Sequence, residues 1–203
     1  MKPTILLIGG ATGTGKSTVA TDVAHRLGIN RVTATDVVRQ TLRAYFPFGE
    51  MPSIHRSSFE APPDEPLIDG FLDQCKQVLV AVQASVERAI FEGWSMIVEG
   101  VHVVPGMLSV PADDAIVVEC VFTIDDLETH ASHFWIRDAS SGGERPVKKY
   151  LDRLDDIRRL QDYVVERARE YGVPVFENSK VSDTVDAVIE LVLGSAAERL
   201  EAV

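Results

Sequence analysis

The sequence predicts an α/β fold in which a parallel sheet lies between two layers of helices. Short apolar runs, such as residues 3–9 and 116–123, alternate with longer stretches whose apolar residues recur at helical spacing. This alternation is typical of parallel strands joined by right-handed helical crossovers. A glycine-rich segment follows the first run, and a Ser-Gly break interrupts the helical pattern at residues 140–143. We expect one domain over residues 1–203, with three layers (α/β/α), a five-stranded parallel sheet and a small helical lid near residues 125–150.

The first apolar run leads into a phosphate-binding loop. Residues 10–17 (GATGTGKS) match the pattern G-x-x-x-x-G-K-[ST], and a helical pattern follows them. Glycines let consecutive N–H groups turn toward phosphate oxygens, and a helix N-terminus points its free amides at the same anion. A glycine-rich turn that binds nothing is the alternative, but strand, loop, Lys-Ser pair and helix occur together. The residues expected to hold a nucleoside triphosphate are Gly10, Thr12, Gly13, Thr14, Gly15, Lys16, Ser17 and Thr18.

Composition and charge limit the class of protein. The chain is 45% hydrophobic and 25% charged, as in ordinary globular domains, and its formal net charge is −11. Binding of nucleic acid depends on Lys and Arg, so this balance argues against such a partner. The two cysteines are far apart, as expected in a reducing cytosol, and the apolar N-terminus is too short for a signal peptide or a membrane span. We expect a cytoplasmic protein with no membrane partner and with a homodimer as its candidate assembly.

The remaining elements follow from apolar periodicity and from breaks in it. Residues 46–66 contain five prolines and show no periodicity, which predicts a long surface loop, and loops of this length are often functional. Residues 67–91 show the longest amphipathic helical pattern. The other expected elements are helices at 17–27 and 36–45, the latter with Asp36 as its N-cap, strands at 29–34, 94–98 and 173–176, and helices beginning at Asp125, covering 150–171 and lying around 185–192.

Two charged residues follow the second expected strand. Ligands of open parallel sheets bind beyond the carboxyl ends of the strands, where the residues after each strand converge. Asp36 and Arg39 lie there, one helical turn apart on the same face. In that position Asp36 can accept the proton of an attacking hydroxyl, and Arg39 can clamp an anionic substrate. The alternative is a helix cap beside a solvent-exposed arginine, but a place after the strand that follows a P-loop favours the catalytic interpretation.

Glu99 ends a hydrophobic strand, where a carboxylate is costly to bury without a cation. We therefore predict that Glu99 and the Ser17 hydroxyl hold Mg²⁺ together. His102 and His55 lie in loops from which either can reach a substrate, and a loop histidine is equally often structural. Of the two, His102 is the one that we assign to the substrate site.

Positive charge is concentrated around the expected lid. Arg137 and Arg145 flank the Ser-Gly break, where closure of a lid brings cations onto a transferring phosphoryl group. Later basic residues alternate with acidic ones, which is typical of a solvated helix face. Arg56, in the long loop, has no periodic role and is predicted to bind a second anionic group of the substrate. His130 and His133 lie one helical turn apart without a further ligand cluster, so we assign them to no metal.

Several segments, taken together, resemble 2-phosphoglycerate kinases, and the resemblance covers nearly the whole chain. Many families share the P-loop, so most of its weight lies on the segments that begin at residues 35, 55 and 98. The segments are 8–18 (IGGATGTGKST), 35–39 (TDVVR), 55–60 (HRSSFE), 98–106 (VEGVHVVPG), 150–163 (YLDRLDDIRRLQDY) and 173–178 (VPVFEN).

The resemblance implies a P-loop NTPase fold like that of nucleoside monophosphate kinases. It implies ATP- and Mg²⁺-dependent phosphorylation of 2-phosphoglycerate, a small phosphorylated acid, to 2,3-bisphosphoglycerate. Archaeal members carry an additional region before the P-loop, whereas this sequence begins at the first strand, so we expect a short form. The expected catalytic residues are Lys16, Asp36, Arg39 and Arg137, and the expected substrate-binding residues are Arg39, Arg56 and His102.

Two other kinds of function stay open on the sequence alone. Kinases with a D-x-x-R segment after the second strand also act on polynucleotide 5′-hydroxyls or nucleotide sugars, and related kinases act on mevalonate phosphate. The acidic balance argues against a polynucleotide acceptor. A regulatory protein that uses ATP or GTP as a switch is the second kind, although the sequence contains no N-K-x-D segment for guanine.

Overall fold

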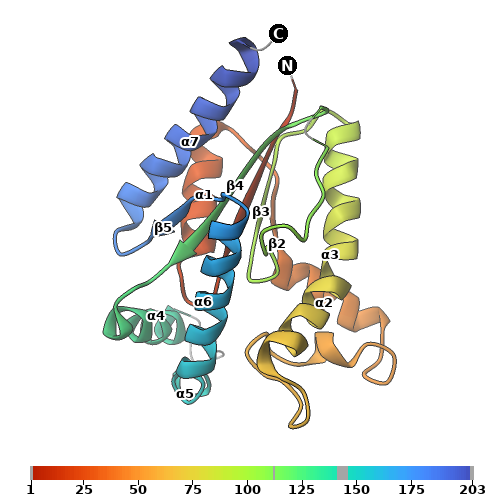
Figure 1. The fold of residues 1–203 in the computed structure, drawn as a ribbon, viewed down its shortest axis with the longest axis vertical. Coiled ribbons are helices and arrows are strands. Elements are labelled where there is room, and N and C mark those ends of the chain that lie inside the picture. Colours follow the sequence, from red (N-terminus) through yellow and green to blue (C-terminus); the bar gives the residue numbers. More distant parts are fainter. Residues whose placement is uncertain (1, 112, 141–145, 202–203) are drawn as a thin grey trace.

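Five parallel strands form one sheet within residues 2–111, 113–140 and 146–201, which the computed structural model describes (Figure 1). The strand order is β2-β3-β1-β4-β5, so β1 lies in the centre and β2 and β5 lie at the edges. The predicted parallel sheet is confirmed. Its strands are β1 (Thr4–Gly10), β2 (Val32–Ala34), β3 (Met96–Glu99), β4 (Ile116–Thr123) and β5 (Val175–Glu177).

Strand β1 is fixed in the core because both its edges and both its faces are covered. It pairs in parallel with β3 on one side and with β4 on the other. Ile5 and Leu7 lie in one apolar cluster, and Leu6 and Ile8 lie in a second, since side chains alternate along a strand. All four are at most 2% exposed, and each such burial contributes roughly 1.5–3 kcal/mol. The P-loop therefore starts from a rigid strand.

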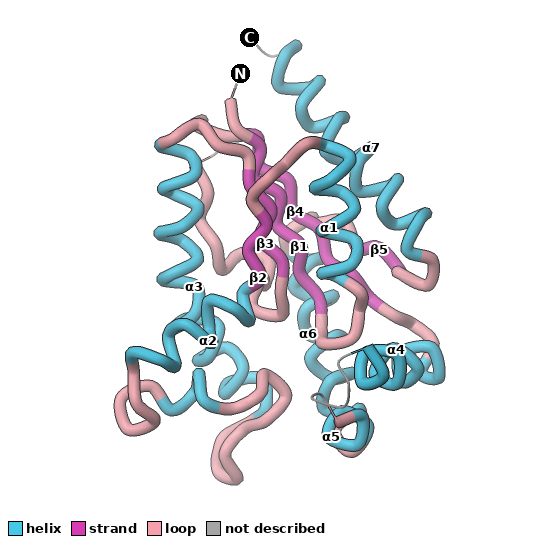
Figure 2. Tube along the Cα trace, turned by 180° about the vertical axis from the view of Figure 1, so that it is seen from behind, coloured by secondary structure: helices cyan, strands magenta, loops and turns pink. Residues whose placement is uncertain are grey.

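Two layers of helices cover the sheet. Helices α3 (Leu67–Phe91) and α6 (Leu154–Glu170) pack on the face that contains Ile5. Helices α1 (Lys16–Leu27) and α7 (Val181–Glu201) lie side by side on the opposite face (Figure 2). The predicted α/β/α layering is thus confirmed. None of the helices in the described part of the chain combines the length and the apolar character needed to cross a membrane.

Shorter elements gather at the carboxyl ends of the strands, on the same side of the molecule as the P-loop (Figures 1 and 2). Helix α2 directly follows β2, and α4 and α5 lie close together below β4 and β5 in Figure 1. This end of the sheet is where ligands of parallel α/β proteins bind. The elements are α2 (Thr35–Tyr45), a short 3₁₀ helix η1 (Pro52–His55), α4 (Leu127–Ser140) and α5 (Val147–Leu151).

The expected helix at 150–171 is wrong as a single element. The structure divides this stretch into α5 and α6, and the break lies at Asp152 and Arg153. Arg153 has φ −122° and ψ 18°, which lie outside the helical region. The apolar spacing of the sequence continues across the break because Leu151 and Leu154 both pack against the same cluster.

Two other local predictions need correction. Asp36 does not cap α2, because Ala34 is the N-cap residue and Asp36 lies in the first helical turn. The stretch at 46–66 is not wholly a surface loop, because it contains η1 and buries Ile54 and Phe59. Both side chains join the cluster of α3, so the stretch is held against the core.

Candidate active site

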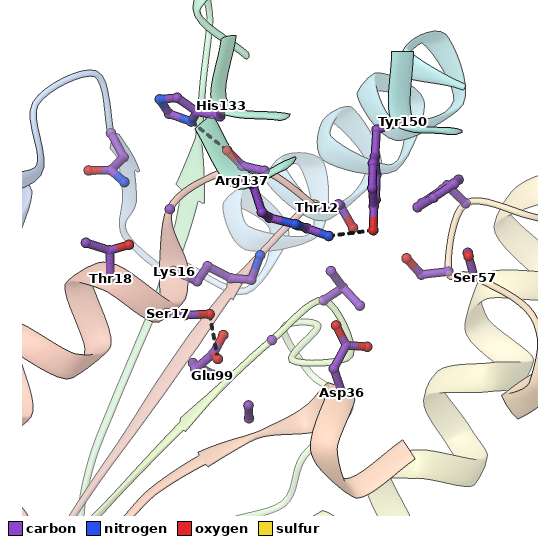
Figure 3. A pocket seen from close by; sticks show the side chains of 18 of the residues that line it. Thr12, Lys16, Ser17, Thr18, Asp36, Ser57, Glu99, His133, Arg137 and Tyr150 are labelled. Atoms are coloured by element: carbon purple, nitrogen blue, oxygen red, sulfur yellow. Dashed lines mark hydrogen bonds between the residues drawn. The ribbon is translucent and has the colours of Figure 1, made fainter. Parts of the chain in front are cut away.

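A pocket of about 560 Å³ opens at the carboxyl ends of the strands. Figure 3 shows Lys16, Asp36, Arg137 and Tyr150 arranged around this hollow. The P-loop, the start of α2, the end of β3 and the helices α4 and α5 all contribute to its lining. The polar and charged lining residues are Thr12, Lys16, Ser17, Thr18, Asp36, Arg39, Ser57, Ser58, Glu99, His133, Arg137, Tyr150 and Asn178.

The P-loop backbone takes the conformation that its glycines allow. Gly13 and Gly15 have φ angles of 89° and 78°, in the left-handed region that L side chains rarely adopt. Space is also short there, because a Cβ on Gly15 would lie 2.4 Å from the amide nitrogen of Asn178. Gly10 is likewise at positive φ. The predicted phosphate-binding loop is therefore formed, and α1 begins at Lys16, directly after it.

Lys16 is buried in the loop that it completes. Its Nζ donates to the carbonyl of Ala11 at 2.7 Å. Burial lowers the pKa of Lys16 to about 8, although the carboxylates of Glu99 and Asp36 act in the opposite direction. The ammonium group is thus still mostly charged at neutral pH, and it lies within the loop.

Ser17 and Glu99, the two predicted metal ligands, lie in direct contact. The Ser17 hydroxyl donates to Glu99 Oε1 at 2.8 Å, as the dashed line in Figure 3 marks. Glu99 is only 5% exposed, and it comes from β3 while Ser17 comes from α1. A hydroxyl and a carboxylate are the hard oxygen donors that Mg²⁺ prefers. The residues present therefore fit a magnesium ion that is also bound by phosphate oxygens.

Asp36 and Arg39 form an ion pair at the opposite side of the pocket, with 3.3 Å between Asp36 Oδ1 and Arg39 Nε. Arg39 Nη1 donates to the carbonyls of Ile54 and Arg56, which fixes the guanidinium. Its second terminal nitrogen, Nη2, makes no hydrogen bond to the described residues. Asp36 remains 68% exposed. A carboxylate and a guanidinium nitrogen are thus available here to a ligand.

The pKa of Asp36 lies below its ordinary value of 3.8. Burial on its own raises it, but the electrostatic effects of His102, Arg39 and Lys16, together with the hydrogen bond from Arg39, outweigh burial. Asp36 is accordingly ionised across the neutral range. An ionised carboxylate can accept a hydrogen bond from an alcohol and orient it for attack.

Arg137 reaches the pocket from α4. Its Nη2 donates to the Tyr150 hydroxyl at 2.7 Å, and its guanidinium carbon lies 4.5 Å from the centre of the Tyr150 ring. Tyr150 belongs to α5, so this contact joins α4 and α5 at the edge of the pocket (Figure 3). Arg145, the second predicted lid cation, lies outside the described residues.

The structure does not bring Arg56, His102 or His55 into the pocket. Arg56 pairs with Glu65 at 3.0 Å beside α3. His102 is fully buried, and burial lowers its pKa to about 4 against the raising effect of Asp36. His55 Nε2 lies 2.8 Å from the carbonyl of Phe46. These side chains support the walls of the site and do not line it.

His102 supports α2 through a buried chain of hydrogen bonds. The amide nitrogen of Gln74 donates to the carbonyls of Ser53 and Arg56, so its Oε1 is the acceptor that faces His102 Nε2 at 3.0 Å. His102 Nε2 therefore carries the proton, and Nδ1 accepts from the Thr35 hydroxyl at 2.8 Å. Thr35 is the first residue of α2. His102 thus ties the helix of the Asp36 carboxylate to α3.

Sequence reasoning missed several pocket residues. Asn178 follows β5, and its Nδ2 donates to the carbonyl of Thr14 at 2.8 Å. The rule that ligands bind after strand ends, extended to this last strand, would have found it. Tyr150 was not predicted as a pocket residue because the apolar pattern assigned it to the expected long helix at 150–171, which the structure divides into α5 and α6. Contacts of His130 and His133 with the P-loop carried no sequence signal, because they join residues 118 and 120 positions apart in the chain.

Comparison with curated proteins identifies close relatives. The chain is 43% identical to the 2-phosphoglycerate kinase of Thermococcus kodakarensis over 91% of its length, and 37% identical to that of Methanopyrus kandleri over 94%. It is 38% identical to that of Pyrococcus horikoshii over 97%. The chain spans 61–66% of the length of these three relatives. No protein-family model matches the chain.

The solved structures with a similar fold include small-molecule kinases. Shikimate kinase from Acinetobacter baumannii matches 96% of this chain and 95% of its own, with a TM-score of 0.53 and 17% identity. A gluconokinase from Sinorhizobium meliloti matches 98% of this chain and 95% of its own, with a TM-score of 0.53 and 14% identity. At this level of identity the likeness concerns the fold alone. The chain has the fold of the P-loop kinases, and by sequence it is a relative of the curated 2-phosphoglycerate kinases.

Proposed function

We propose that this chain is a kinase that transfers the γ-phosphoryl group of ATP to the hydroxyl of 2-phosphoglycerate, with Mg²⁺ as cofactor. The product is 2,3-bisphosphoglycerate. One observation carries the proposal: a single pocket contains a P-loop, the Ser17–Glu99 pair and the Asp36–Arg39 pair. The names of the archaeal relatives favour this acceptor among small phosphorylated acids.

The nucleotide half of the site consists of the P-loop and its immediate neighbours. Loop amides and the N-terminus of α1 are suited to the β- and γ-phosphates, and Lys16 adds a positive charge within the loop. Ser17 and Glu99 are the residues that would hold Mg²⁺, which neutralises the charge that builds up on the transferring group.

The acceptor half consists of Asp36, Arg39 and Arg137. Asp36 accepts a hydrogen bond from the substrate hydroxyl, whose oxygen forms a bond to the γ-phosphorus while the bond to the β-γ bridging oxygen breaks. The hydroxyl proton passes to Asp36 or to water. Arg39 Nη2 is suited to the phosphate or carboxylate of the acid, and Arg137 lies above Lys16, where it can stabilise charge on the transferring group (Figure 3).

The proposal is tested by measuring ADP formation with 2-phosphoglycerate, 3-phosphoglycerate, glycerate and mevalonate phosphates as acceptors. We expect Mg²⁺-dependent turnover that is greatest with 2-phosphoglycerate and absent without an acceptor. A preference for another acid would replace the proposed substrate. ATP binding without stimulation by any acceptor would point to a nucleotide-dependent switch and would refute the kinase proposal.

A further inference from the structure

One face of α4 lies against the P-loop. Its residues His130, His133, Phe134 and Arg137 are three or four positions apart, so they form a single stripe along the helix. Phe134 is 1% exposed and His130 is fully buried, while His133 and Arg137 line the pocket. The stripe therefore runs from the buried side of the loop to the place where phosphoryl transfer is proposed.

The two histidines bind successive carbonyl groups of the loop. His130 Nε2 lies 2.8 Å from the Thr12 oxygen, and His133 Nδ1 lies 2.7 Å from the Gly13 oxygen, as the dashed line from His133 in Figure 3 marks. A carbonyl oxygen only accepts, so each imidazole nitrogen must carry the proton and donate. His130 Nδ1 has no hydrogen-bond partner among the described residues. Both rings thus act as N–H donors to the backbone.

These two bonds fix the direction of two peptide planes. In a trans peptide the carbonyl and the following N–H point to opposite sides. Holding the Thr12 and Gly13 carbonyls toward α4 therefore turns the N–H groups of Gly13 and Thr14 the other way. The glycine gives this segment little resistance to a peptide flip, since it readily occupies conformations closed to other residues. The two histidine donors therefore help to hold the N–H groups of Gly13 and Thr14 turned away from α4.

We propose that His130 and His133 are positioning residues that hold the amides of Gly13 and Thr14 toward the phosphates of the bound nucleotide. This inference rests on the nucleotide half of the proposed function. Neither histidine touches the reacting atoms. Their contribution is made before the nucleotide arrives, because a loop already in the binding conformation loses less conformational freedom on binding.

The same helix also sets the position of Arg137. The His130 ring stacks on Phe134 at 5.5 Å between centroids, and Phe134 stacks on Tyr150 at 5.0 Å with 6° between the rings. Tyr150 in turn accepts a hydrogen bond from Arg137. The register of α4 that brings the histidines to the loop carbonyls is therefore the register that brings Arg137 to the pocket. Loss of the histidine bonds is expected to affect nucleotide affinity first and turnover second.

Paired substitutions test the proposal. His133→Asn keeps an N–H at the position of Nδ1, whereas His133→Ala removes it. His130→Gln keeps an N–H near Nε2, whereas His130→Phe keeps an apolar ring without a donor. Each donor-free variant loses one neutral hydrogen bond to the loop, so we expect it to bind ATP about three- to tenfold more weakly in calorimetric titrations. The Asn and Gln variants should stay within about twofold of the unmodified chain.

His25→Ala, on the exposed face of α1, is the matched control and should bind ATP normally. His133 is only partly buried, so its variants give an answer even if His130→Phe does not fold. ATP binding by His133→Ala that equals the unmodified chain would overturn the inference, and so would equal losses in His133→Asn and His133→Ala. An unmodified chain that binds no ATP would instead refute the proposed function itself. In kinetics, the donor-free variants should raise KM for ATP and leave KM for the acid unchanged.

Discussion

At the scale of single residues, the site separates groups that face the ligand from groups that support them. Asp36 is exposed to the pocket, while His102 behind it is fully buried and binds the first residue of α2. Both are polar residues that follow or lie near strand ends, so the sequence does not distinguish them. The difference arises from α3, whose Gln74 accepts a hydrogen bond from His102 Nε2 in the core, where His102 is fully buried.

Replacing Asp36 tests its assignment to the acceptor hydroxyl. We expect Asp36→Asn to lower kcat by about 100-fold or more, because loss of a general base typically has an effect of this size. ATP affinity should change little, since the side chain lies opposite the P-loop. Steady-state kinetics checks this, with Asp22→Asn, a partly exposed aspartate on α1 that pairs with Arg26 outside the pocket, as the control. A kcat within a few-fold of the unmodified chain would show that Asp36 has no catalytic part.

The buried His102 makes stability depend on pH in a defined direction. Its pKa is about 4 in the folded chain and 6.5 when unfolded, so the unfolded state takes up the proton first as pH falls. The contribution of His102 to the free energy of unfolding is therefore complete above pH 6.5. It is lost progressively between pH 6.5 and pH 4, and the loss is about 3 kcal/mol at most.

Denaturant titrations at pH 7 and pH 5 measure this loss. Glu119 acts in the opposite direction, because burial raises its pKa to about 7 and its stability contribution is lost as pH rises from 4.5 to 7. The unmodified chain is therefore expected to show a partly cancelled dependence. His102→Gln should be relatively more stable at pH 5 than the unmodified chain, and Glu119→Gln relatively less. Identical pH profiles for all three chains would contradict the assignment of either group.

At the scale of elements, the position of Tyr150 depends on a helix break that the apolar spacing of the sequence does not reveal. Tyr150 lies in α5, separated from α6 by Asp152 and Arg153, and this separation directs its ring toward α4 and the pocket. The apolar spacing predicts helix on both sides of the break because it records only which residues are buried. Elements with one long amphipathic face, such as α3, were predicted with their observed bounds. The orientation of short helices depends on contacts that are distant in sequence.

Tyr150 variants test whether α5 positions Arg137. Tyr150→Phe removes the hydroxyl that accepts from Arg137 and leaves the ring stack on Phe134. A hydrogen bond to a charged group contributes about 1.5–3 kcal/mol to the stability of a protein. We expect its loss to lower kcat about tenfold without raising KM for ATP. Tyr171→Phe, half-exposed beside the end of α6, is the control. An unchanged kcat in Tyr150→Phe would remove Tyr150 from the positioning of Arg137.

At the scale of the whole molecule, strand alternation and the glycine-rich motif were enough to predict the sheet, the layers and the loop that lines one side of the pocket. β1, β4 and α3 follow from apolar periodicity, and the loop follows from its glycines and the Lys-Ser pair. The acceptor half was predicted less completely. Asp36 and Arg39 reach the pocket, but the ion pair of Arg56 with Glu65 depends on how the 46–66 stretch folds onto α3, which no local pattern encodes.

Nucleotide binding should stabilise the whole fold. A ligand that binds only the folded state contributes about 2.7 kcal/mol at 100 times its Kd. For a chain of this size that corresponds to a rise in Tm of about 5–10 °C. Thermal unfolding with and without Mg²⁺ and ATP measures it, and Lys16→Ala should abolish the shift. A shift of equal size in that variant would place the nucleotide elsewhere.

The two halves of the site are attached to the sheet very differently. The P-loop extends from β1, which has neighbours on both sides, whereas α2 follows β2, a three-residue strand at the sheet edge that pairs only with β3. Substitutions at the exposed side of α2, where Asp36 lies, therefore disturb few contacts of the core, whereas Val38 and Leu42 on its other side pack against it. In such an architecture the segment proposed to bind the acceptor can change during evolution while the P-loop is retained. Because this segment is peripheral, protein engineers can alter substrate preference there at small cost in stability.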